Sequence, residues 1–357
     1  MTTTKGALGS TSVTAYLQAL AIKTQQTCLG GVKSALNHIS AHDPTGATQD
    51  IAAVSKACLL LDGGGAGGLV YPYDFPDPFV LRVGSTYFAY ATNSTEGNIQ
   101  IIESSDLRHW NDAGSALPVL PSWATPGGTW APSVLQIGNS FVLYYAVAVG
   151  GRLGEECISE ATAAQPQGPF VDDSTSPLVC QSNRNGSIDP SPFVDANGTP
   201  YLEWKSNGGP HQPAVLWSEQ LNAPGTEFAG SAPSPMLASD DGWDAGVIEA
   251  PDLVLFQGRY LLFYSENNWN SSAYAVGWTT CKGPLGPCTE PLSKPIFTSG
   301  ADIAGPGGES VFTDSSGSVW MAFAAWIPGE VGYPNSRAFY LRRLNLSGSS
   351  PVIEPTG

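Results

Sequence analysis

Charged residues are scarce in this sequence, and positively charged residues are the scarcest. Only 13% of the 357 residues are Asp, Glu, Lys or Arg, against about 25% in an average soluble protein. The 15 Lys and Arg are outnumbered by 31 Asp and Glu, which gives a formal net charge of −16. No basic stripe is present, so we expect no nucleic acid or anionic membrane as a partner. An uninterrupted apolar run of about 18 residues, which a membrane-spanning helix requires, is also missing.

A metal site built from cysteine and histidine is not expected. None of the six cysteines forms a CxxC or a zinc-type spacing, and the four histidines are scattered. An even number of cysteines indicates disulfides instead, although six of them permit 15 pairings. Proximity along the chain favours the pairs Cys28–Cys58, Cys157–Cys180 and Cys281–Cys288.

Disulfides favour an extracellular location. Five Asn-x-Ser/Thr sequons are compatible with secretion: Asn93, Asn185, Asn197, Asn270 and Asn345. The first residues contain no apolar h-region. We therefore expect that a signal peptide has been removed from this sequence or that export uses another route.

Glycine, proline and aromatic residues are abundant. The chain has 41 Gly and 29 Pro, and 10% of its residues are Phe, Trp or Tyr. Glycine and proline favour tight turns, and aromatic residues favour strands. This composition predicts an all-β protein that binds a neutral ligand.

Residues 1–68 differ from the rest of the chain. Apolar residues recur there at helical spacing within 13–20, 32–39 and 50–61, which predicts three short helices. We expect a small N-terminal α-helical appendage, of unknown role, that packs against the main domain. The main domain then covers residues 69–357.

A repeat of roughly 55–60 residues, the length of a propeller blade, fills the main domain. Each copy is a short strand, a turn containing glycine, and a second strand rich in aromatic and β-branched residues. The five copies open at Asp77, Ala131, Asp189, Ala250 and Gly308. The repeat predicts a five-bladed β-propeller.

Three carboxylates fall at or beside these opening positions. Asp77 and Asp189 occupy the position itself, and Glu249 directly precedes Ala250. Each could be explained by turn chemistry before a proline. However, the first strands of all blades line the central channel, so matching positions surround one of its mouths. Because the three carboxylates occupy matching positions in their repeats, they are expected to form one shared site.

Two carboxylates that face each other across a neutral ligand suit hydrolysis of a glycosidic bond, with one protonated and one ionised. The apolar sequence around Glu249 favours a raised pKa and the role of general acid. Asp77 is the candidate base. Asp189 is expected to keep Glu249 protonated and in place. The candidates for stacking on sugar rings are Phe75, Trp130, Trp204 and Trp269.

The ordered set Asp77-Pro, Trp130-Ala-Pro, Ser187-Ile-Asp-Pro and Val247-Ile-Glu-Ala-Pro resembles glycoside hydrolase family 43. This resemblance implies a five-bladed propeller and inverting hydrolysis of α-L-arabinofuranosides or β-xylosides. It also implies that Asp77 is the general base, Asp189 the residue that modulates the pKa of the acid and orients it, and Glu249 the general acid. Arg337 matches a substrate-contacting arginine in the last blade.

One motif departs from the family. Many arabinan-cleaving members have Gly-Pro-Gly-His in the last blade, and this His helps to hold a channel water or a calcium ion. Here the run is Gly305-Pro-Gly-Gly308. We therefore expect no cofactor or metal, and the departure counts against an endo-arabinanase of that type.

The leading hypothesis is a monomeric, exo-acting α-L-arabinofuranosidase that acts on arabinan or arabinoxylan of the plant cell wall. A β-xylosidase of the same family is the nearest alternative. A retaining propeller enzyme active on fructan or sucrose and a non-catalytic carbohydrate-binding propeller remain as further alternatives.

Overall fold

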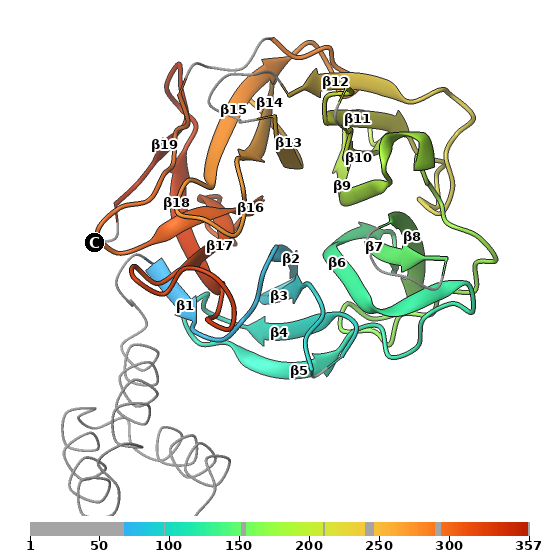
Figure 1. The fold of residues 1–357 in the computed structure, drawn as a ribbon, viewed down its shortest axis with the longest axis horizontal. Helices are drawn as coiled ribbons and strands as arrows, with labels where there is room; N and C mark the ends of the chain where they lie inside the picture. Colours follow the sequence, from blue (N-terminus) through green and yellow to red (C-terminus); the bar gives the residue numbers. More distant parts are fainter. Residues whose placement is uncertain are drawn as a thin grey trace, which may run out of the picture.

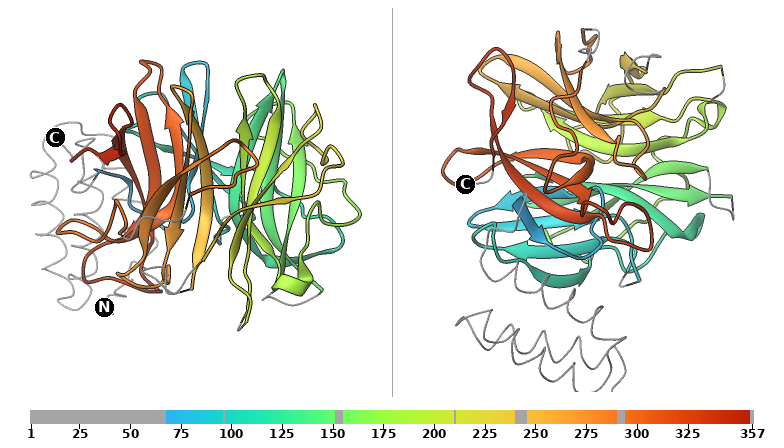
Figure 2. Two further views of the ribbon diagram at one scale, coloured as in Figure 1. Left: turned by 90° about the horizontal axis from the view of Figure 1, so that it is seen from above. Right: turned by 60° about the vertical axis from the view of Figure 1, so that its left-hand side comes forward.

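The computed structural model describes residues 68–95, 97–150, 155–209, 211–239, 246–289 and 294–355. Within these ranges the chain forms five antiparallel sheets around one axis (Figure 1). Figure 2 shows the same ring from two further directions. The predicted five-bladed propeller is confirmed. The predicted helical appendage and the pair Cys28–Cys58 lie outside the described residues.

Each predicted repeat begins a blade, and the strands of a blade follow one another outwards from the channel. Blade one contains β2 (Phe79–Val83), β3 (Thr86–Ala91), β4 (Gln100–Ser104) and β5 (Asn111–Ser115), and blade two contains β6 (Ala124–Ile137), β7 (Ser140–Val149) and β8 (Glu156–Ala163). A short 3-10 helix, η2 (Ser182–Arg184), precedes blade three, which contains β9 (Ser187–Val194), β10 (Pro200–Ser206), β11 (Val215–Gln220) and β12 (Ser234–Ala238). Blade four contains β13 (Ile248–Phe256), β14 (Arg259–Glu266) and β15 (Ala275–Cys281), and blade five contains β16 (Ala304–Thr313), β17 (Val319–Trp326) and β18 (Ala338–Asn345).

Both ends of the described chain join blade five. Strand β1 (Leu69–Tyr71) pairs antiparallel with β18, and Leu69 lies opposite Tyr340. Strand β19 (Val352–Ile353) also pairs with β18. The segment that precedes blade one is thus part of the sheet of the last blade, so backbone hydrogen bonds close the ring.

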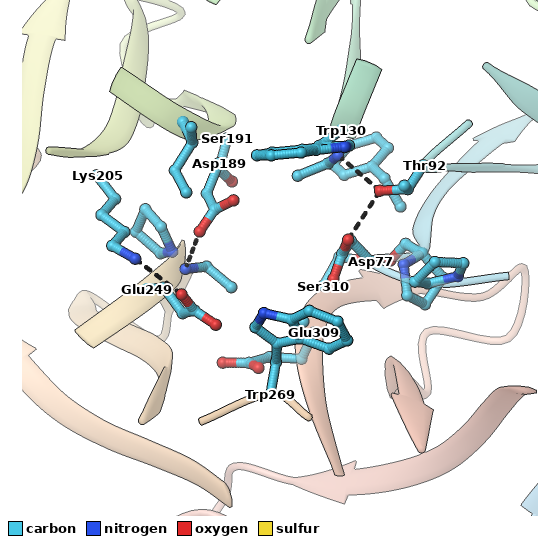
Figure 3. Close-up of a pocket in the computed structure, with 18 of the residues that line it drawn as sticks. Asp77, Thr92, Trp130, Asp189, Ser191, Lys205, Glu249, Trp269, Glu309 and Ser310 are labelled. Carbon is cyan, nitrogen blue, oxygen red and sulfur yellow. Dashed lines mark hydrogen bonds and ion pairs between the residues drawn. The ribbon is translucent and has the colours of Figure 1, made fainter. Parts of the chain in front are cut away.

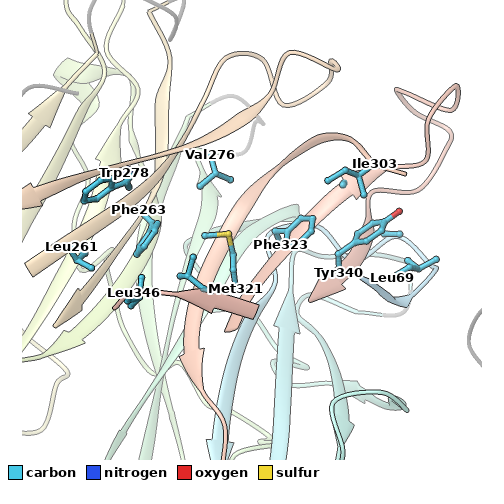
Figure 4. Close-up of a cluster of buried hydrophobic side chains, with 13 residues drawn as sticks. Leu69, Leu261, Phe263, Val276, Trp278, Ile303, Met321, Phe323, Tyr340 and Leu346 are labelled. Carbon is cyan, nitrogen blue, oxygen red and sulfur yellow. The ribbon is translucent and has the colours of Figure 1, made fainter. Parts of the chain in front are cut away.

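A hydrophobic core fills each of the five interfaces between neighbouring blades. Side chains of a strand point alternately to its two faces, so each blade supplies residues to two cores. In β3, for example, Phe88 and Tyr90 pack against blade two, whereas Tyr87 and Ala89 pack against blade five. Figure 4 shows the core between blades four and five. Because both faces are buried, these strands have nearly continuous apolar sequences.

Two predicted disulfides are present. Cys157 of β8 is bonded to Cys180, and Cys281 at the end of β15 is bonded to Cys288. Both tie an outer strand to the loop that follows it. No helix among the described residues is long and apolar enough to cross a bilayer.

Candidate active site

The residues that open the five repeats share an unusual backbone conformation. All have positive φ angles: 55° at Asp77, 44° at Ala131, 56° at Asp189, 51° at Ala250 and 59° at Gly308. Only a few per cent of residues other than glycine adopt this left-handed region. In blades two to five the strand register shifts at or beside this residue. The resulting bulges change the direction in which the neighbouring side chains point, here at one end of the channel.

A cavity of about 650 Å³ lies at this end of the channel and is lined by residues of all five blades. Asp77, Asp189 and Glu249 all line it, as Figure 3 shows. The structure therefore brings together the three carboxylates that were predicted from their matching positions in the repeats. A cavity of this size suits a small ligand such as one or two sugar units.

Two donors fix the orientation of the Asp77 carboxylate. The Thr92 hydroxyl donates to Oδ2 at 2.8 Å, and Nη1 of the buried Arg337 donates to Oδ1 at 3.3 Å. The Asp74 carboxylate holds Arg337 itself, because it accepts a hydrogen bond of 2.8 Å from the Arg337 backbone N–H. The guanidinium also lies 5.5 Å from the ring centre of Trp269.

Glu249 does not have the apolar environment that its sequence neighbours indicate. Lys205 Nζ lies 2.8 Å from its Oε2, and the Tyr274 hydroxyl donates to Oε1 at 2.7 Å. Burial raises the pKa of Glu249, but the charge of Lys205 and the hydrogen bonds from Lys205 and Tyr274 outweigh it and lower the pKa below its usual value. The predicted rise in the pKa of Glu249 is therefore wrong, because residues distant in sequence surround the carboxylate.

Asp189 has the opposite balance. Its Oδ2 accepts a hydrogen bond of 2.9 Å from the Ala250 backbone N–H. Burial and the negative charge of Glu249 raise its pKa to about 7, and the charge of Lys205 only partly opposes this. Asp189, rather than Glu249, therefore holds the proton of this pair in the ligand-free site. The expectation that Asp189 keeps Glu249 protonated is reversed.

The four aromatic candidates divide into two groups. Trp130 and Trp269 line the cavity, and Trp269 is 38% exposed. Phe75 and Trp204 are fully buried and do not line it. Phe75 packs in the core between blades five and one, whereas Trp204 packs between blades two and three and donates its Nε1–H to Gln181 Oε1. Neither offers a ring face to a sugar, so these two predictions are wrong.

The position of Gly308 does not fit a calcium ion held through a histidine. It carries no side chain, and an added Cβ would lie 2.5 Å from Asp77 Oδ1. No cluster of three or more His, Cys, Asp and Glu suited to a metal occurs within the described ranges. The next residue, Glu309, is buried and accepts a hydrogen bond from the Ser265 hydroxyl on Oε2. Burial raises its pKa well above the usual value.

The family model of glycosyl hydrolases family 43 matches residues 69–349. The chain belongs to this family. Among solved structures, an endo-1,4-β-xylanase from Bacteroides thetaiotaomicron is similar to it with a TM-score of 0.69 and 28% identity, over 80% of this chain and 96% of that one. A thermostable family-43 glycoside hydrolase has the same fold, with a TM-score of 0.73 and 24% identity over 82% of this chain and 97% of its own.

Curated relatives of this family 43 chain differ in the sugars that their names state. A β-D-galactofuranosidase of Aspergillus niger is 25% identical over 279 residues, which are 72% of this chain and 76% of the relative. An extracellular endo-α-(1→5)-L-arabinanase of Bacillus subtilis is 25% identical over 257 residues, which are 66% of this chain and 76% of the relative.

Proposed function

We propose that the protein is a secreted, inverting α-L-arabinofuranosidase that acts, as a monomer, on the ends or side chains of arabinan or arabinoxylan. The observation that carries this proposal is the convergence of Asp77, Asp189 and Glu249 on one cavity with aromatic walls. Family membership supports hydrolysis of a glycosidic bond. The two bonded cysteine pairs support an oxidising compartment.

Asp77 is the proposed general base. Its two donors leave the carboxylate oriented toward the cavity, where it can take a proton from a water molecule that attacks the anomeric carbon. Arg337 and Trp269, which are in contact with each other, are the proposed binding residues on the same side of the cavity. Trp130 lines another part of the cavity and is proposed to stack on a sugar face.

Glu249 is the proposed general acid, and Asp189 orients the backbone beside it through the Ala250 N–H. The two buried carboxyls interact strongly, so the pair titrates in two steps whose apparent pKa values belong to both groups, and one proton remains between the two steps. Asp189 holds this proton in the ligand-free site and gives it up to Glu249 when the leaving oxygen contacts Glu249. Protonation of that oxygen by Glu249 then assists bond cleavage.

A panel of aryl glycosides tests the substrate class. We expect p-nitrophenyl α-L-arabinofuranoside to have the highest kcat/KM, above p-nitrophenyl β-D-xylopyranoside. Release of arabinose alone from branched arabinan would support exo action, whereas long oligosaccharides from linear arabinan would replace it by endo action. No hydrolysis of any glycoside would favour the non-catalytic carbohydrate-binding alternative.

The stereochemistry of the first product tests the role of Asp77. An inverted anomer, observed by NMR in the first minutes of the reaction, is the expected result. A retained anomer would make Asp77 a nucleophile, as in the retaining alternative active on fructan or sucrose.

Hydrolysis of β-D-galactofuranosides is the second candidate, because the similarity to the Aspergillus niger galactofuranosidase covers 72% of this chain. The two sugars share the configuration of the furanose ring, and galactofuranose carries one additional hydroxymethyl group. A higher kcat/KM for p-nitrophenyl β-D-galactofuranoside than for the arabinofuranoside would select this candidate.

A further inference from the structure

Lys205 was not among the residues that the sequence indicated, yet its ammonium group contacts the proposed acid directly. It lies on β10 of blade three, whereas Glu249 lies on β13 of blade four. Lys205 is only 6% exposed, and its Nζ is 2.8 Å from Glu249 Oε2. Burial lowers the pKa of Lys205, but the charges of Glu249 and Asp189 raise it above the usual value. The lysine therefore stays positively charged inside the site.

Other ionisable groups also face Glu249, and they come from blades three, four and five. Arg337 acts on Glu249 through its charge, but its Nη1 is paired with Asp77 at 3.3 Å. The remaining groups are Asp189 of β9, Tyr274 before β15 and Glu309 of β16. Lys205 is thus the cation in contact with Glu249 within the described part of the chain.

The donors divide unequally between the two carboxyls of the pair. Glu249 receives an ammonium group and a phenol hydroxyl, whereas Asp189 receives one backbone N–H. Hydrogen bonds from a cation stabilise an ionised carboxylate far more than a protonated one. The proton of the pair is consequently left to Asp189.

We propose that Lys205 is a positioning residue of the hydrolytic site, which fixes Glu249 Oε2 and stabilises the carboxylate that Glu249 becomes after it donates its proton. In that step the O–H bond of the Glu249 carboxyl breaks and the leaving oxygen gains the proton. The new carboxylate then pairs with the ammonium group. This inference rests on the proposed function, because it assigns Lys205 to the same reaction.

The pH dependence of the reaction should reveal this role. The positive charge of Lys205 favours loss of the proton that Asp189 and Glu249 share. Removing this charge should therefore let the two carboxyls keep their proton to a higher pH. We expect Lys205→Gln to move the alkaline limb of kcat/KM upward by about 1 unit or more. Lys205→Arg keeps the charge and should leave the limb within a few tenths of a unit. Lys205→Met, which keeps the length of the side chain, repeats the test if the glutamine variant does not fold.

A titration that does not require activity separates this inference from the proposed function. Protein labelled with 13C at the Asp and Glu carboxyls is titrated by NMR, with Asp189→Asn and Glu249→Gln to assign the signals. A higher apparent pKa of the pair in Lys205→Gln, but not in Lys205→Arg, supports the role of Lys205. Equal values in all three proteins would overturn it, even if arabinofuranosides are hydrolysed. A shifted titration in a protein that hydrolyses no glycoside would reject the proposed function and keep the electrostatic effect of Lys205.

Discussion

Gly308 lies directly against Asp77: a Cβ placed on Gly308 would be 2.5 Å from Asp77 Oδ1 and 3.3 Å from Asp77 Cα. Gly307, the residue before Gly308, lies similarly close to Tyr274 on the Glu249 side of the cavity. A Cβ on Gly307 would lie 2.2 Å from the ring of Tyr274, which donates to Glu249. The glycine run of blade five therefore leaves space for the Asp77 carboxylate and for the Tyr274 ring, whose hydroxyl donates to Glu249.

Gly308→Ala should reduce activity much more than stability. The methyl group would displace the Asp77 carboxylate from Thr92 and Arg337. A displacement of about 1 Å of a reacting group can cost roughly 10²-fold in rate, so we expect kcat/KM to fall by about that factor. The φ angle of 59° at Gly308 adds a strain of about 1 kcal/mol. Kinetics on an aryl arabinofuranoside, together with thermal unfolding, measure the two effects.

Gly317→Ala is the matched control, because Gly317 has a φ of 84° and no atom lies within 4 Å of the position that its new methyl group would take. It should show a similar loss of stability and unchanged kinetics. Equal kinetics in Gly308→Ala and Gly317→Ala would show that the contact with Asp77 is irrelevant to the reaction.

Different leaving groups should separate the roles of Glu249 and Asp77. An activated aryl group needs little proton donation, so Glu249→Gln should spare aryl glycosides relative to arabinan. Asp77→Asn removes the base, and both substrates should lose activity by about 10²- to 10⁴-fold. Steady-state kinetics on both substrates check this. Equal damage by both variants on both substrates would contradict the division of roles.

The blades and the convergence of the carboxylates could be predicted because they are encoded in a local repeat. Each copy contains its own strands and turn, and equivalent positions of Asp77 and Asp189 meet around the axis. Thr92 and Tyr274 could not be predicted in this way. They reach the cavity from beyond the second strands of their blades, at positions that have no common offset from the start of the repeat.

Lys205 could have been found from the alternation along β10. Leu202 and Trp204 both face the core between blades two and three. Side chains of a strand alternate, so Glu203 and Lys205 must face the other way. The pKa directions of Asp189 and Glu249 were predicted wrongly because this lysine was overlooked: Lys205 lies opposite Ile188, next to Asp189, and pairs with Glu249 of the following blade.

The stability of the protein should depend on the ionisation of Asp252, which lies in the channel wall. Its oxygens accept hydrogen bonds from the Ser191 hydroxyl and the Val311 N–H, and burial raises its pKa from 3.8 to about 7. The folded protein therefore keeps a proton that the unfolded chain loses. This contribution makes the free energy of unfolding fall by about 1.4 kcal/mol per pH unit between about pH 4 and 7.

Asp252→Asn should remove that dependence, because an amide does not titrate, its oxygen can still accept from the Val311 N–H, and its NH2 group can donate to the Ser191 oxygen once that hydroxyl rotates. The variant should be close to the wild type in stability near pH 4 and more stable near pH 7. Urea unfolding at a series of pH values measures the difference between the two proteins. A difference that does not change with pH would mean that Asp252 is ionised in the folded state.

Trp269 and Trp204 were both predicted to bind sugar, and their variants should now behave differently. Trp269 lines the cavity against Arg337, so Trp269→Ala should raise KM for arabinan by roughly tenfold through lost stacking, with a small effect on stability. Trp204 is fully buried between blades two and three, so Trp204→Ala should cost about 3–5 kcal/mol of stability. Below its unfolding temperature, Trp204→Ala should keep the wild-type KM. A raised KM in a folded Trp204→Ala protein would return this residue to the binding site, and an unchanged KM in Trp269→Ala would remove Trp269 from it.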